Sequence, residues 1–337
     1  MMSQVALLSI EDLSVEFATR AGRYYVSKSV SLSVARGQTL ALVGESGCGK
    51  SVTMRSILGL LPGATSVVSG RAMFGDINLL QLDQRALNRV RGKRIAMIFQ
   101  EPTSALNPTL RIGTQISEVL RLHQNLSKGA ALKRAVELLD GVRIPEPAHR
   151  CRQYPFELSG GMLQRVMIAM ALAGEPELLI ADEPTTALDT TIQAQILDLL
   201  KSIQQQRGMS IVLVTHDLGI VARMADQVAV MYAGEIVEQA GVDSLFDQPM
   251  HPYTQGLLAA TPRLSAGSNA RLQAIPGAPP DLRSQRAGCS FAPRCAHCMQ
   301  ICLQQGAPRL DSKLGHYVHC WRYHTANPTA PRTLALS

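Results

Sequence analysis

The chain has 337 residues, of which 46% are hydrophobic and 4% aromatic, and it carries a formal net charge of +7. This composition is ordinary for a globular protein with a full core. Its longest apolar stretch, Val166 to Gly174, is too short to span a bilayer, which takes about 20 residues. Lys and Arg are scattered rather than clustered, which favours a solvated surface over a face that binds nucleic acid. The first residues lack the pattern of a signal peptide, so we expect any membrane spans to belong to another chain.

The N-terminal part predicts strands followed by a helix. Leu13–Phe17 and Ser29–Val34 alternate apolar and polar residues around a break that contains glycine, which suggests a hairpin. Thr39–Val43 is almost continuously apolar and predicts a buried strand. A helical pattern from Val52 to Leu61 follows after a short glycine-rich segment.

Helices and strands then alternate. Residues 104–165 are rich in helical patterning, and Leu178–Ala181 and Ser210–Val214 predict buried strands separated by a helix at Gln193–Gln206. A strand pair is expected around Val228–Val237. This order predicts an α/β fold with a mainly parallel sheet.

The composition shifts to Pro, Gly, Arg and Cys beyond residue 251. We therefore expect a first domain at 1–260, with a helical subdomain at about 104–165, and a small Cys-rich extension at 261–337.

The glycine-rich segment between strand and helix matches the phosphate-binding pattern G-x-x-x-x-G-K-[ST]. In such a loop the backbone amides surround phosphate oxygens, and the next helix presents its positive end. Lys50 would neutralise the β- and γ-phosphates of ATP, and the Ser51 hydroxyl would coordinate Mg²⁺. The cysteine of the loop, Cys48, is expected to pack away from the phosphates. The predicted nucleotide-binding residues are Gly44, Glu45, Ser46, Gly47, Cys48, Gly49, Lys50 and Ser51.

Two acidic residues follow the predicted strand Leu178–Ala181. Asp182 and Glu183 would emerge at its carboxyl end, where ligands bind in open α/β sheets. Asp182 would hold Mg²⁺, and Glu183 would act as the general base on the attacking water. An acidic helix cap is the alternative, but beside a phosphate-binding loop the pair favours ATP hydrolysis.

Leu158–Arg165 reads Leu-Ser-Gly-Gly-Met-Leu-Gln-Arg and opens an apolar helical run. Ser159 could cap that helix, and the two glycines leave its amides bare for a phosphate. One active site does not need two phosphate loops, so the second makes sense if it closes on ATP held by another subunit. Here the sequence resembles the ABC ATPases, whose signature is similar to LSGGQ. The match continues at Gln100, Asp189 and His216, and the position that often carries Gln in the signature is Met162.

The resemblance covers about residues 5–250 and implies an ABC-type nucleotide-binding domain with an antiparallel β subdomain and a helical subdomain. It also implies a head-to-tail dimer in which one chain's phosphate loop meets the other chain's signature. Gln100 would sense the γ-phosphate, reach Mg²⁺ and couple to the membrane subunits, while His216 would position the γ-phosphate and water. The signature-side residues would be Ser159, Gly160, Gly161 and Asp189. An aromatic residue usually stacks on adenine in this family; the candidates are Phe17, Tyr24 and Tyr25, with Phe17 preferred.

Four stretches are similar to the ATPases of dipeptide, oligopeptide and nickel importers: Ile98–Pro108, Met231–Glu238, His251–Thr254 and Ile275–Leu282. The resemblance implies a peripheral subunit on the cytoplasmic face of the inner membrane that energises uptake of peptides. Its partners would be a second ATPase (a paralogue or itself), two permeases and an extracytoplasmic substrate-binding protein. Nickel or another small solute remains an alternative cargo. A soluble ABC ATPase in repair or translation is disfavoured, because the chain has one phosphate loop, one signature and no sustained heptads.

The C-terminal cysteines form a separate group. Without a secretion signal, metal ligation is a better default for them than disulfides. The spacing of Cys289, Cys295, Cys302 and Cys320 resembles the dipeptide-type ATPases, in which four thiolates can hold a [4Fe–4S] cluster. Zinc is the rival, because Cys295 and Cys298 have C-x2-C spacing and His297, His316 and His319 lie nearby in sequence. Reduced thiols without metal are a third reading, and each reading makes the site structural.

Overall fold

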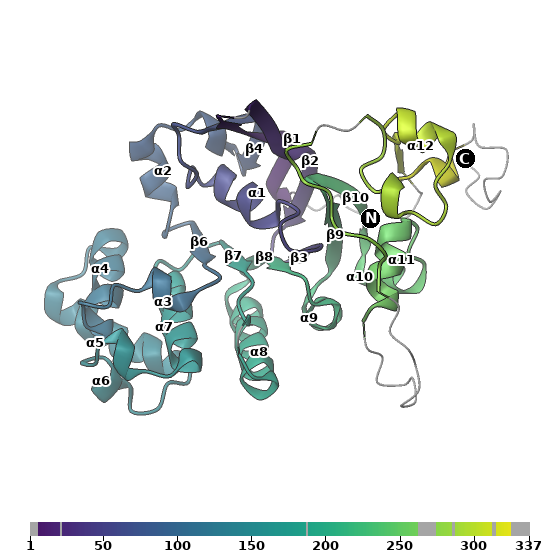
Figure 1. Ribbon diagram of the computed structural model, residues 1–337. Coiled ribbons are helices and arrows are strands. Elements are labelled where there is room, and N and C mark those ends of the chain that lie inside the picture. The colour runs from purple at the N-terminus through teal and green to yellow at the C-terminus, as the bar shows by residue number, and fades with distance from the viewer. Residues whose placement is uncertain are drawn as a thin grey trace. The chain divides into compact units, whose positions relative to one another are not determined.

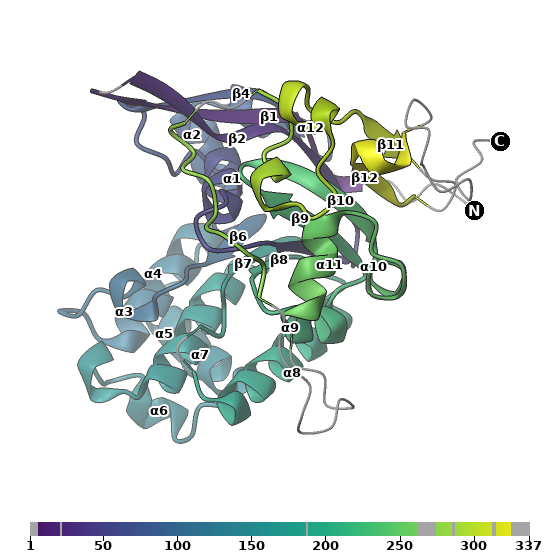
Figure 2. The same cartoon turned by 45° about the vertical axis from the view of Figure 1, so that its right-hand side comes forward.

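The computed structural model describes residues 6–324 except 21, 187, 262–273, 285–286 and 312–314 (Figures 1 and 2). The chain folds into two compact units. The first comprises residues 34–38 and 81–214, and the second comprises residues 6–33, 39–80 and the chain from 215 onward. The predicted boundary near residue 260 stays a prediction, and much of 261–337 lies outside the described residues.

The first unit contains three parallel strands in the order β8-β7-β6. They are β6 (Ile95–Ile98), β7 (Leu178–Asp182) and β8 (Ser210–Thr215). Every residue of β7 is buried, as expected for a parallel strand covered on both faces. Ile98 pairs with Ala181 and Asp182 with Val214, so the residues that follow β6 and β7 leave the same edge.

Helices make up the rest of the first unit. They are α2 (Gln84–Val90), α3 (Pro102–Ala105), α4 (Ile112–Gln124), α5 (Lys128–Gly141), α6 (Pro147–Arg150), α7 (Gly160–Leu172) and α8 (Thr190–Arg207). Ser127, Ser159 and Asp189 cap α5, α7 and α8 with their side-chain oxygens, which supplies acceptors for amides that a helix start leaves without partners. Helices α3 to α6 lie in the stretch whose sequence pattern predicts helices.

The second unit begins with an antiparallel sheet in the order β2-β1-β4-β5. Its strands are β1 (Ala6–Thr19), β2 (Gly22–Ala35), β4 (Ser66–Phe74) and β5 (Ile77–Asn78). The register of β1 on β4 shifts between Glu11 and Ser14. The sequence predicts the hairpin at the start of this sheet but misses β4, which carries polar residues and a glycine (Gly70) in its middle.

A second group of strands in this unit has the order β11-β12-β10-β9-β3. These strands are β3 (Thr39–Val43), β9 (Gln227–Tyr232), β10 (Glu235–Gly241), β11 (Arg309–Asp311) and β12 (Tyr317–His319). β3 and β9 run parallel, and the other neighbours are antiparallel. The Cys-rich extension therefore adds two strands to a sheet that begins beside the phosphate loop.

Short helices complete the second unit: α1 (Lys50–Ile57), α9 (Leu218–Met224), α10 (Val242–Asp247), α11 (Pro252–Ala259) and α12 (Gln300–Gln304). Its core joins β3, β9 and α11 to the extension through three aromatic rings. The ring centroids of Tyr232 and Tyr253 are 4.6 Å apart, and Phe291 lies 5.2 Å from Tyr232. All three are buried, so the extension packs into the same hydrophobic core as the strand that leads to the phosphate loop.

Candidate nucleotide-binding site

The phosphate-loop motif forms the turn between β3 and α1, as the sequence predicts. Gly49, the residue before the helix, has a φ of 108°, and a Cβ there would collide with the backbone oxygen of Val26. Only glycine adopts such a conformation readily. Since Gly49 offers no side chain to cap α1, the start of the helix is suited to a phosphate as its cap.

Lys50 is buried and its ammonium turns back onto its own loop. Its Nζ donates to the backbone oxygen of Gly44 at 2.7 Å and to that of Glu45 at 2.9 Å. The Cys48 thiol lies 3.7 Å from the same Nζ. Burial raises the pKa of Cys48, which keeps its thiol protonated. The loop thus holds one cation at its centre, where a bound phosphate would meet it.

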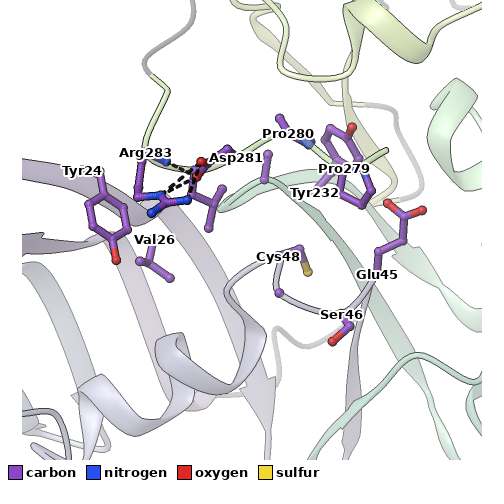
Figure 3. Close-up of a pocket in the computed structure, with 13 residues that line it drawn as sticks. Tyr24, Val26, Glu45, Ser46, Cys48, Tyr232, Pro279, Pro280, Asp281 and Arg283 are labelled. Atoms are coloured by element: carbon purple, nitrogen blue, oxygen red, sulfur yellow. Dashed lines mark hydrogen bonds and ion pairs between the residues drawn. The ribbon is translucent and has the colours of Figure 1, made fainter. Parts of the chain in front are cut away.

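A pocket of about 460 Å³ opens beside the phosphate loop (Figure 3). Tyr24 and Val26 of β2 line it on one side, and loop residues 45–48 line it on another. Residues 279–283, from the C-terminal extension, also line it. Of the three aromatic candidates for adenine, only Tyr24 is among these lining residues; Phe17 stacks on Tyr24 at 6.3 Å between ring centroids. The role of Phe17 stays a prediction.

In the first unit, Gln100 and Glu183 meet at the carboxyl ends of β6 and β7. Gln100 Nε2 donates to Glu183 Oε2 at 3.0 Å, and the Thr186 hydroxyl donates to the same oxygen at 2.8 Å. Glu183 has a φ of 47°, an unusual value for a residue with a side chain. Such conformations concentrate at functional sites. Asp182, the residue before it, is fully buried.

The signature segment starts α7 with Ser159 as its cap. The Ser159 hydroxyl accepts from the Met162 amide at 3.4 Å. Gly160 is exposed, and a Cβ added there would meet nothing within 4 Å. The first turn of α7 is therefore accessible at Gly160, as a second phosphate-contacting loop requires.

Two further predicted residues occupy loops. Asp189 caps α8, accepting from the Ile192 amide at 2.9 Å; its neighbour at 187 lies outside the described residues. His216 is exposed and follows β8, in the second unit.

The four cysteines predicted as cluster ligands line one pocket in the extension, together with His251 and His297. Burial raises the pKa of Cys289 to about 11 and that of Cys320 to about 12. Within the part of the chain that the structure describes, no three His, Cys, Asp or Glu side chains are placed to hold a single metal ion. His316, one of the histidines of the zinc reading, has its Nε2 at 2.7 Å from Glu238 Oε1.

The sequence pattern does not reveal several residues that contact the predicted site residues within one unit or the other. They are Thr186, Tyr253, Arg294 and the pocket-lining segment 279–283. Thr186 follows the acidic pair closely enough in sequence to be suspected. The others lie more than two hundred residues from the loop or strand that they contact, and no motif spacing connects them.

Comparison with known proteins shows which family the chain resembles. A family model described as ABC transporter matches residues 27–186, and one described as oligopeptide/dipeptide transporter, C-terminal region, matches residues 237–302. The oligopeptide transport ATP-binding protein OppD of Bacillus subtilis (strain 168) is 50% identical over 333 residues, covering 98% of this chain and 92% of that protein. The dipeptide transport ATP-binding protein DppD of the same organism is 49% identical over 316 residues, covering 94% of each.

Among solved structures, the dimeric ATP-binding cassette MJ0796 in a post-hydrolysis state with ADP and Pi is similar, with a TM-score of 0.63 at 28% identity. That match covers 70% of this chain and 98% of that one. The fold and the phosphate loop define an ABC ATPase. The chain belongs to the ATP-binding proteins of ABC transporters, in the oligopeptide/dipeptide group. Among the described residues, no helix has the length and apolar character needed to cross a membrane.

Proposed function

We propose that this ATPase is the energising subunit of an ABC importer for dipeptides or oligopeptides. The observation that carries the proposal is the match to peptide-transport ATP-binding proteins over 98% of the chain, C-terminal region included. Its partners in the proposal are a second ATP-binding subunit, two permeases and an extracytoplasmic substrate-binding protein. The chain would work peripherally, at the cytoplasmic face of the inner membrane.

We assign the nucleotide roles residue by residue. Lys50 and the amides of its loop would bind the β- and γ-phosphates of ATP. The Ser51 hydroxyl and the buried Asp182 carboxylate are oxygen ligands of the kind that Mg²⁺ prefers; Gln100 is a further candidate. When bound, Mg²⁺ would offset the charge that develops on the phosphates during hydrolysis.

Glu183 is our candidate for the general base. The Gln100 amide and the Thr186 hydroxyl both donate to its Oε2, and these two bonds hold that oxygen in place. A carboxylate held in one orientation can take the proton from an attacking water without first reorganising. His216 would position the water and the γ-phosphate.

The remaining predicted residues belong to a site shared between two subunits. Ser159, Gly160 and Gly161 would contact the nucleotide of the partner ATPase through the start of α7, with Asp189 beside them. The half-buried ring of Tyr24 is a better placed candidate than Phe17 for stacking on adenine, since it lines the pocket beside the loop.

The ATPase roles are tested with purified protein. Lys50→Ala should lose ATP binding, whereas Glu183→Gln should bind ATP and fail to turn it over. Wild-type turnover by Glu183→Gln would remove that residue from the base role.

The transport role is tested separately, by uptake of a labelled dipeptide in cells that lack the subunit. Uptake that returns with the wild-type gene but not with Glu183→Gln supports peptide import. If dipeptide uptake never depends on the gene, labelled nickel and longer peptides are the next cargoes to try.

For the extension we propose a structural [4Fe–4S] cluster held by Cys289, Cys295, Cys302 and Cys320. Their convergence on one pocket supports the proposal, and such a cluster is larger than a single ion and is ligated by thiolates. Anaerobically purified protein should then carry about four irons per chain. Stoichiometric zinc would favour the rival metal, and protein free of both would leave reduced thiols.

A further inference from the structure

The second residue of the phosphate loop, Glu45, is bound by an arginine from the far end of the chain. Arg294 Nη1 donates to Glu45 Oε2 at 2.6 Å, and Arg294 Nη2 donates to Glu45 Oε1 at 2.9 Å. The arginine side chain is 5% exposed and the glutamate side chain 25%. Paired donors on paired acceptors are the strongest arrangement of this ion pair, and burial shields it from salt.

Arg294 is itself fixed by the extension. Its Nε donates to the Pro276 backbone oxygen at 2.9 Å, and its Nη1 reaches the Tyr232 hydroxyl at 3.4 Å. The hydrogen bonds that Arg294 donates to Glu45 are the main cause of its raised pKa, so its charge is permanent. The Arg294 guanidinium is therefore a positive charge held in one position beside the loop, rather than a flexible surface group.

Glu45 also contacts the centre of the loop. Its backbone oxygen accepts from Lys50 Nζ at 2.9 Å, and its amide donates to the Tyr253 hydroxyl at 2.8 Å. One residue thus connects the phosphate-binding lysine to Arg294 and to α11. A shift of Arg294 would be felt at Lys50 through this single residue.

The Glu45–Arg294 ion pair changes the net charge that the loop presents to a phosphate. A carboxylate within a phosphate-binding loop repels the phosphates that the loop binds, and this repulsion is strong where water is scarce. With Arg294 in place, the pair carries no net charge. Without it, the loop would keep a negative charge next to a polyanionic ligand.

The extension reaches the same pocket at a second place. Residues 279–283 line this pocket, with Arg283 beside Tyr24, and within this segment Arg283 Nη2 donates to Asp281 Oδ2 at 2.8 Å (Figure 3). The C-terminal extension therefore both neutralises the phosphate loop and forms part of the pocket wall.

We infer that Arg294 is a positioning residue of the nucleotide site, which makes ATP affinity depend on the Cys-rich extension through Glu45. This inference rests on the proposed role of residues 44–51 in binding ATP. It assigns to the extension a part in nucleotide binding that is separate from any metal that its cysteines hold.

The test is a charge series on the full-length chain, with fluorescent ATP titrated into the wild type, Arg294→Met, Glu45→Gln and the double variant. Arg294→Met should weaken binding at least about tenfold, because a partly buried carboxylate is left unpaired. The double variant should return to within about threefold of the wild type, and Glu45→Gln alone should bind ATP more tightly than the wild type, because the Arg294 cation is then left uncompensated beside the phosphates.

A matched control distinguishes the loss of ATP affinity in Arg294→Met from a general disturbance of the extension. Arg309 forms a similar pair with Asp311, but both side chains are largely exposed. Arg309→Ala should leave ATP affinity within about twofold of the wild type.

Two results would overturn the inference. One is wild-type affinity in Arg294→Met; the other is an equal loss in the double variant, which would make the role of Arg294 purely structural. A wild-type chain that does not bind ATP would instead refute the proposed role of the phosphate loop.

Discussion

Glu238 offers the sharpest test of how the extension is attached. This carboxylate is fully buried in β10 and accepts three hydrogen bonds. They come from the Met250 amide at 2.6 Å, the His251 amide at 2.8 Å and His316 Nε2 at 2.7 Å. It thus joins the start of α11 and the chain before β12 to one strand.

The effect of Glu238→Ala can be worked out from these bonds. Each buried donor left without an acceptor costs about 1–3 kcal/mol. Three such donors, with some relaxation of the chain, give an expected loss of about 3–6 kcal/mol in the free energy of unfolding. Glu238→Gln can keep two of the three bonds through one oxygen, so its loss should be about 1–3 kcal/mol.

Urea unfolding with two probes measures this. Circular dichroism follows the whole chain, and fluorescence follows the only tryptophan, Trp321, which lies in the extension. Glu235→Ala is the matched control: it is a glutamate of the same strand, but it is a third exposed and pairs with an exposed lysine. Its loss should stay below about 1 kcal/mol. If Glu238→Ala and Glu235→Ala unfold alike, the three bonds do not stabilise the extension as reasoned here.

Three further predictions concern the nucleotide site. Gln100→Ala should lower the rate of ATP hydrolysis at saturating ATP about ten- to a hundredfold, because Glu183 loses one of the bonds that orient it; an unchanged rate at saturating ATP would contradict this. Gly49→Ala should abolish ATP binding and lower the melting temperature, since a Cβ at this φ collides with a neighbouring backbone oxygen; normal binding would show that the loop tolerates another shape. Tyr24→Ala should weaken ATP affinity about tenfold, the value of a lost ring stack, while Phe17→Ala should not; the reverse order in equilibrium titrations would restore Phe17 as the adenine partner.

The sequence could predict the parts of the site that local patterns determine. A phosphate loop needs glycines at fixed spacing, so the motif at Gly44–Ser51 can be recognised from the sequence alone. The acidic pair after Leu178–Ala181 follows from one apolar strand and the rule that ligands bind at its carboxyl end. Gln100 and Glu183 could each be predicted as site residues, but the contact between them depends on the register of β6 on β7 and could not be predicted.

The parts that sequence could not predict depend on contacts between distant residues. Glu45 and Arg294 are 249 positions apart, and neither a period nor a motif relates them. Strand β4 was missed because it alternates only weakly and is half exposed. The gathering of four cysteines around one pocket could be suspected from their number, but their spacing does not fix how closely the sulfur atoms approach.

Strand β12 has a consequence for any attempt to shorten the chain. β10 pairs with β9 on one side and with β12 on the other, so removal of the extension would leave β10 as a bare sheet edge. Unpaired edges invite pairing between molecules and aggregation. Among the described residues the edge strand is β11, which is only three residues long and begins and ends with the paired charges of Arg309 and Asp311, which is how natural sheets protect an edge. By covering the edge of β10, the extension therefore also prevents self-association. A chain that is cut near residue 260 should precipitate even though its phosphate loop is intact.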